Sequence, residues 1–170
     1  DNAHLKVRMI DCVGYIVDSS LGYVEDNEPR MVTTPWFDHP IAFNEAAEIG
    51  TKKVICEHST IGLVVTTDGT ITEIDRNDYV DAENRVINEL KAINKPFIVL
   101  LNSVAPNSQS AQNLKAELEA KHGVPVVAVN CEELNATDIH NIIETVLFEF
   151  PLKEININIP DWIEELDSEH

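Results

Sequence analysis

The chain has 170 residues, 44% of them hydrophobic, and this length suits one domain with a sizeable core. Its 30 acidic and 12 basic residues give a formal net charge of −18, which repels nucleic-acid phosphates and anionic lipid headgroups. We therefore expect no nucleic-acid partner and no direct membrane insertion. No apolar run in the sequence is long enough to span a bilayer.

The cysteines and the first residue bear on the setting of the chain. Cys12, Cys56 and Cys131 are odd in number and far apart, which predicts a reducing compartment and no disulfide framework. The chain begins at Asp1 without an initiator methionine. We expect it to be a segment of a longer protein.

A short apolar run opens the chain. Residues 5–10 read as a buried strand that ends at Asp11, and Gly14 follows three residues later. This D-x-x-G arrangement is typical of P-loop nucleotide hydrolases, in which the carboxylate holds Mg²⁺ and the glycine lets the backbone approach a terminal phosphate. Taken alone, a strand that ends in an ordinary turn explains the pattern about equally well.

A long polar stretch follows over residues 15–40, with three prolines and no sustained period. A loop of this length is usually functional, although a solvated excursion has the same composition. Trp36 and Phe37 indicate that part of the stretch packs against the rest of the molecule.

The remainder of the chain alternates helices and strands. Helices are predicted over 41–57, 78–93, 109–121 and 138–148, and strands over 61–67, 97–101 and 124–129. We expect Asp78 and Thr137 to cap the helices at whose starts they lie. Continuous apolar strands between amphipathic helices predict an α/β fold with a mostly parallel sheet and helices on both faces. Residues 152–159 alternate apolar and polar side chains, as in a half-exposed edge strand, and an acidic tail follows.

Polar residues follow several of these strands directly. They are Asp11, Thr67 with Asp68, Asn102 with Ser103, and Asn130 with Cys131. Ligands of parallel α/β sheets bind at the carboxyl ends of the strands. The shared edge therefore favours a ligand site over an ordinary turn at the D-x-x-G pattern.

Several stretches resemble one family. The residues DCVGY at 11–15, the run at 44–70, KPFIVLLNS at 95–103 and the ending FPLKEININIPDW are similar to the stage IV sporulation protein A family, the bacterial spore-coat morphogenetic ATPases. The resemblance covers nearly the whole chain. It implies a P-loop NTPase domain of the translation-factor-related GTPase type over residues 1–150. Residues 151–170 would then lead to a following domain.

The resemblance implies a function as well as a fold. It implies an ATP hydrolase that uses ATP and Mg²⁺, and whose hydrolysis drives self-assembly of the basement platform of the spore coat. The partners would be further copies of the same protein and other spore-coat or membrane-anchoring morphogenetic proteins. The location would be the mother-cell cytoplasm, at the surface of the outer forespore membrane.

Catalytic residues carry over position by position from the resemblance. Asp11 matches the Walker B aspartate and would hold Mg²⁺ through water, and Gly14 matches the glycine that senses the γ-phosphate. Tyr15 stands where many GTPases place a water-orienting glutamine, so the hydrolytic water would need another partner.

Nucleotide-binding residues carry over in the same way. The stretch NSVA at 102–105 stands where GTPases have N-K-x-D, and Ala105 lacks the carboxylate that accepts hydrogen bonds from guanine. This loss of guanine selectivity agrees with an ATPase. The expected nucleotide-binding residues are Asn102, Ser103, Asn130 and Cys131. The two asparagines could equally well cap loops.

One family motif is missing from these residues. No G-x-x-x-x-G-K-[ST] stretch occurs, and in the family it precedes the position where this chain starts. We therefore expect this fragment alone to be inactive and to bind ATP poorly. The strand that leads into that loop would lie between the strands at 5–10 and 61–67. Without it the chain must close the gap, recruit another chain or expose an apolar edge, so we expect rearrangement or dimerisation near residues 5–10.

Two other readings stay open. A non-catalytic acidic interaction module for spore-coat assembly is favoured by the missing phosphate-binding loop. A flavodoxin-like or receiver domain fits the α/β pattern, but a receiver needs an acidic pair beside Asp11, which the sequence lacks.

Overall fold

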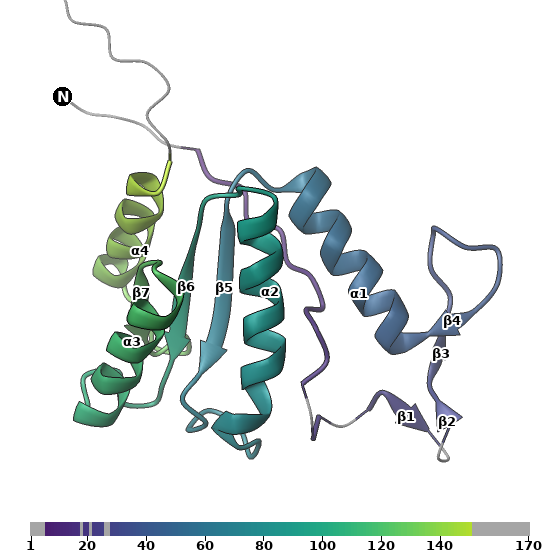
Figure 1. The fold of residues 1–170 in the computed structure, drawn as a ribbon, viewed down its shortest axis with the longest axis horizontal. Helices are drawn as coiled ribbons and strands as arrows, with labels where there is room; N and C mark the ends of the chain where they lie inside the picture. The colour runs from purple at the N-terminus through teal and green to yellow at the C-terminus, as the bar shows by residue number, and fades with distance from the viewer. Residues whose placement is uncertain (1–5, 18, 21, 26–27, 151–170) are drawn as a thin grey trace, which may run out of the picture.

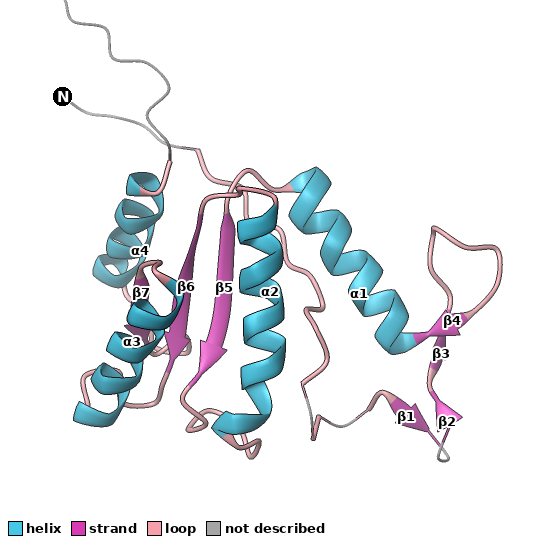
Figure 2. Ribbon diagram, in the orientation of Figure 1, coloured by secondary structure: helices cyan, strands magenta, loops and turns pink. Residues whose placement is uncertain are grey.

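The computed structural model describes residues 6–17, 19–20, 22–25 and 28–150, and it shows a parallel sheet with helices on both faces (Figure 1, Figure 2). The strands are β5 (Gly62–Thr67), β6 (Phe97–Asn102) and β7 (Val126–Val129). They pair in that order and all run parallel. The expected α/β class is confirmed.

The helices divide between the two faces. The helices α2 (Val80–Ala92) and α3 (Gln109–His122) lie on one face, and α4 (Ala136–Phe148) lies on the other. The core under α2 and α3 contains Val64, Val99, Leu101, Val126, Ile87, Leu90 and Leu118. The core under α4 contains Ile98, Leu100, Val129 and Ile142. Successive strand residues point to opposite faces, which is why neighbours such as Ile98 and Val99 belong to different cores.

The helix caps differ from the expectation by a few residues. Asp75 accepts the N–H of Asn77 at 2.8 Å and begins a 3-10 turn, Arg76–Tyr79, that leads into α2. Asp78 therefore lies inside this turn, where it cannot cap. Asn135 caps α4 in place of Thr137, and it exchanges hydrogen bonds with Asp138 in a capping box.

Residues 15–42 contain short strands. The pairs are β1 (Val24–Glu25) with β2 (Glu28–Pro29), and β3 (Met31–Val32) with β4 (Ile41–Ala42), both antiparallel. The helix predicted over 41–57 is α1 (Phe43–Lys53), continued by the π-helical turn Val54–His58. Trp36 packs on α1, since its ring lies 3.3 Å from where a Cβ at Gly50 would be.

The prediction of a strand at the start of the chain is wrong for residues 6–10, the part of it that the structure describes. Residues 6–17 hold no strand, and Val7 and Met9 are 56% and 83% exposed. An extended apolar segment becomes a strand only where a neighbouring strand takes up its backbone hydrogen bonds. No such partner lies beside residues 6–10 within the described part of the chain. The segment passes between α1 and α2 instead (Figure 1).

One edge of the sheet is open as a result. β5 pairs only with β6, so its other edge has no partner among the described strands. On the face covered by α4, Leu63 and Val65 of β5 are 38% and 58% exposed, while their register partners on β6 are buried. Among the described residues the apolar edge of β5 is thus exposed, and recruitment of another chain at this edge stays a prediction.

Two further expectations concern membrane spans and the C-terminal end. Within the described residues, no helix combines the length and apolar character that crossing a bilayer requires. The strand expected over 152–159 lies outside the described residues.

Candidate functional site

The carboxyl ends of β6 and β7 bring the expected nucleotide-binding residues together. Asn102 ends β6, and its side-chain Oδ1 accepts the N–H of Cys131 at 2.9 Å. This bond ties the loop after β6 to the loop after β7. It leaves the Asn102 amide nitrogen as the group that a ligand could use as a donor.

The loop after β7 is held by its own polar side chain. Asn130 Oδ1 accepts the N–H of Glu132 at 3.1 Å, which is a loop-capping contact. Cys131 is half-buried, and burial raises the pKa of its thiol. The thiol therefore stays protonated at neutral pH and offers a ligand an apolar surface rather than a charge.

Ser103 has no surface to offer a ligand. It is 0% exposed, and its N–H donates to Val129 O at 2.9 Å. Its Oγ accepts the N–H of Ala105 at 3.1 Å. Ser103 shapes the loop from within, whereas the resemblance implied contact with the nucleotide.

Asp68 belongs to the same edge and was not among the expected site residues. It follows β5 and accepts the N–H and the hydroxyl of Thr70 at 3.0 and 2.6 Å. Burial alone would raise the pKa of the Asp68 carboxyl, but hydrogen bonds from Ser103 and Thr70 outweigh it and hold that pKa below its usual value. The sequence signal for Asp68 was its position at the end of a strand, but the Asp68-Gly69 dipeptide by itself indicates an ordinary turn.

Gly14 is held against α1. Its φ is +82°, a conformation that favours glycine, and its N–H donates to Thr51 Oγ1 at 3.0 Å. Thr51 is 2% exposed, so this contact lies in the interior. Gly14 thus has the backbone freedom that a phosphate-sensing glycine needs, with its donor used inside the chain.

Tyr15 is held against α1 and α2. Its hydroxyl donates to Glu89, and its ring lies under the Arg85 guanidinium at 4.2 Å. Arg85 in turn makes two bonds of 2.8 Å to Glu48 of α1. Burial, with the neighbouring Glu89 carboxylate, raises the pKa of the Tyr15 phenol, so it remains protonated. Tyr15 therefore serves as a fastening point between the D-x-x-G segment and both helices.

Asp11 lies in the segment without secondary structure, and its side chain is exposed. Among the described residues, no three acidic, histidine or cysteine side chains gather as metal ligands would. The structure therefore brings Asn102, Ser103, Asn130 and Cys131 together, and among the described residues it places Asp11 in no cluster of three acidic, histidine or cysteine side chains.

Comparison with known proteins decides the family. The family model described as "Stage IV sporulation protein A, ATPase domain" matches residues 1–151. The chain belongs to the stage IV sporulation protein A family. Relatives named stage IV sporulation protein A occur in Clostridioides difficile, Bacillus anthracis and Bacillus subtilis, and they are 53%, 49% and 48% identical over all 170 residues.

The match covers the chain completely but its relatives only in part. The chain spans 35% of the length of each of these stage IV sporulation protein A sequences. No solved structure matches the chain.

The family's ATPase name implies ATP and a divalent cation, and the described residues fit them only in part. At the carboxyl edge, the Asn102 amide and the loop after β7 present groups that suit a nucleobase. On the phosphate side, Asp11 stands alone and the Gly14 N–H is already bound to Thr51. The described residues by themselves therefore form no magnesium or triphosphate site.

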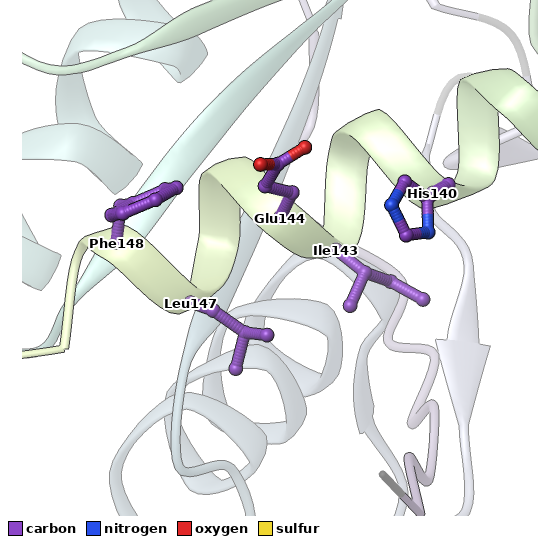
Figure 3. Close-up of a pocket in the computed structure, with 5 residues that line it drawn as sticks. All are labelled: His140, Ile143, Glu144, Leu147 and Phe148. Atoms are coloured by element: carbon purple, nitrogen blue, oxygen red, sulfur yellow. The ribbon is translucent and has the colours of Figure 1, made fainter. Parts of the chain in front are cut away.

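Another surface feature of this family member lies on α4. A shallow hollow of about 340 Å³ is lined by His140, Ile143, Glu144, Leu147 and Phe148. Figure 3 shows Ile143 and Leu147 projecting from the same side of the helix. All five residues belong to one helix, and the lining contains few polar groups, so the hollow is unlike a nucleotide site.

Proposed function

We propose that this chain is part of the ATPase domain of a sporulation protein that hydrolyses ATP with Mg²⁺ and self-assembles into the basement platform of the spore coat. The family match over residues 1–151 is the observation that carries the proposal. The gathering of Asn102 and Cys131 at the carboxyl edge supports a nucleobase position there. The chain alone is proposed to be inactive, because its sequence has no G-x-x-x-x-G-K-[ST] stretch and its described residues form no triphosphate site.

The proposal extends to location and partners. The protein would act in the mother-cell cytoplasm, at the surface of the outer forespore membrane, with copies of itself and other morphogenetic proteins as partners. The net charge of −18 supports protein partners rather than nucleic acid.

ATP turnover tests the enzymatic half of the proposal. This chain is compared with a version extended N-terminally through a phosphate-binding loop. Turnover is expected only in the extended protein, and Asp11→Ala should abolish it. Asp38→Ala is the matched control, because the Asp38 side chain is 99% exposed and pairs, within the part of the chain that the structure describes, only with its neighbour His39. Micromolar ATP binding by the unextended chain in titration calorimetry would contradict its proposed inactivity.

A second candidate function is a non-catalytic interaction module for spore-coat assembly. The apolar surface on α4 favours it, since Ile139, Leu147 and Phe148 are 48%, 45% and 79% exposed. Absence of turnover in both the chain and its extended version would support this module over the ATPase.

A further inference from the structure

The turn after β5 holds the loop after β6. Thr70 Oγ1 accepts the N–H of Val104 at 3.0 Å, and the Asp68 N–H donates to Asn102 O at 3.4 Å. These contacts join two segments that are more than thirty residues apart in the chain. The loop at residues 102–105, called the base-side loop below, is thus fastened to the end of the neighbouring strand.

Asp68 sets the direction of these hydrogen bonds. An ionised carboxylate only accepts, so the hydroxyl of Thr70 must donate to Asp68. The Thr70 oxygen is then left to accept the backbone N–H of Val104 at 3.0 Å. One carboxylate therefore orients one hydroxyl, and that hydroxyl holds one amide of the base-side loop.

The other side of the base-side loop is held equally firmly. Asn102 Oδ1 accepts the N–H of Cys131, and Ser103 N–H donates to Val129 O, both at 2.9 Å. Ser103 is fully buried, whereas the side chain of the next residue, Val104, faces outward and is 59% exposed. A base that binds here meets a surface whose shape is fixed from β5 as well as from β7.

We propose that Asp68 is a positioning residue for nucleobase binding. Through the hydroxyl of Thr70 it fixes the base-side loop in the form that holds the base, without touching the nucleotide itself. The inference rests on the proposed function, because it assumes that a nucleotide binds at this edge. It assigns a role to Asp68 and Thr70 that the resemblance to GTPase motifs does not supply.

Amide hydrogen exchange, followed by NMR on this chain, tests the positioning. Asp68→Asn places an amide where the Thr70 hydroxyl donates, and Thr70→Val removes the acceptor of the Val104 N–H. Exchange at Val104 should become about tenfold faster in both variants, as expected for the loss of one hydrogen bond. Thr70→Ser keeps the hydroxyl and should leave exchange unchanged. Asp75→Asn lies in the same loop between β5 and α2, and it is the control for the loss of one negative charge.

Calorimetry on the full-length protein tests the link to the base. ATP is compared with inorganic tripolyphosphate, which carries the charge of the phosphates but no base. Asp68→Asn and Thr70→Val should weaken ATP binding about tenfold and leave tripolyphosphate binding unchanged. A merely structural defect would weaken both ligands together.

Each other result overturns part of the reasoning. Unchanged exchange at Val104 in Asp68→Asn would refute the positioning role. Faster exchange with unchanged ATP affinity, or equal weakening of ATP and tripolyphosphate, would refute the link to the base. A wild-type protein that binds no ATP would refute the proposed function, while the exchange result would still decide whether Asp68 fixes the loop.

Discussion

Glu83 is a buried carboxylate between α2 and α3, and its removal should leave a buried positive charge unpaired and destabilise the protein. Its side chain is 1% exposed, and Arg76 Nη2 lies 3.0 Å from Oε1 and 2.9 Å from Oε2. His122 Nε2 is 3.9 Å from Oε1, too far for a hydrogen bond. Glu83→Ala would leave the Arg76 guanidinium, only 18% exposed on its side chain, without a counter-ion.

The free energy of unfolding should fall by about 3 kcal/mol in Glu83→Ala. Removing one partner of a buried ion pair costs about 3–5 kcal/mol, and the partial exposure of Arg76 places this case at the low end. The double variant Arg76→Met/Glu83→Leu should recover most of the loss, because it leaves no unpaired charge in the interior.

Urea denaturation followed by circular dichroism measures these differences. Asp81→Ala is the matched control. Asp81 is exposed on the same helix, and it makes no ion pair with any described residue. Its loss should cost about 0.5 kcal/mol through the helix dipole. A loss below about 1 kcal/mol in Glu83→Ala, or a double variant as unstable as the single one, would refute the reasoning.

Three further outcomes are expected from the same assay. Burial, with nearby lysines, lowers the pKa of His122 in the folded protein. As the pH falls, His122 is therefore protonated in the unfolded chain before it is protonated in the folded one. The stability due to neutral His122 is lost as the pH falls below about 6.5. His122→Gln should flatten this part of the pH profile. Gly69→Ala should cost about 2 kcal/mol and more than Gly123→Ala, because φ is positive at both but only at Gly69 would a Cβ lie 3.0 Å from the backbone N of Arg76. Leu118→Ala should cost about 3 kcal/mol by leaving a cavity, since Leu118 is 2% exposed, and a loss under 1 kcal/mol would mean that the core closes around it.

The sheet and its helices were predictable because each carries a complete local signal. The strands at 61–67 and 97–101 are continuous apolar runs, and the structure has β5 and β6 within one residue of those bounds. Helix starts were less predictable because several acceptors lie close together in the sequence. Asp75 and Asn135 are the N-caps in place of Asp78 and Thr137, because Asp75 and Asn135 lie in extended backbone just before the first turn.

The failure of residues 6–10 to form a strand could not be predicted, because strand formation depends on a neighbouring strand as well as on sequence. Residues 6–10 have the composition of a strand but find no partner in the described chain. The site was predictable as an edge, because strand ends in a parallel sheet meet there. The inward orientation of Ser103 and the bond between Thr51 and Gly14 depend on tertiary packing, which no local pattern reports.

The contact between Gly14 and Thr51 means that an anion at this glycine would compete with an acceptor of the protein itself. A backbone N–H has one proton to donate, and a neutral hydroxyl 3.0 Å away already receives it. A hydrogen bond to a charged acceptor contributes about 1 kcal/mol more than one to a neutral acceptor. An anion that takes over the Gly14 N–H would therefore gain only this difference, a factor of about five in affinity, rather than the full strength of a new bond. The interior of the protein thus sets the threshold that any phosphate must exceed to be detected at this glycine.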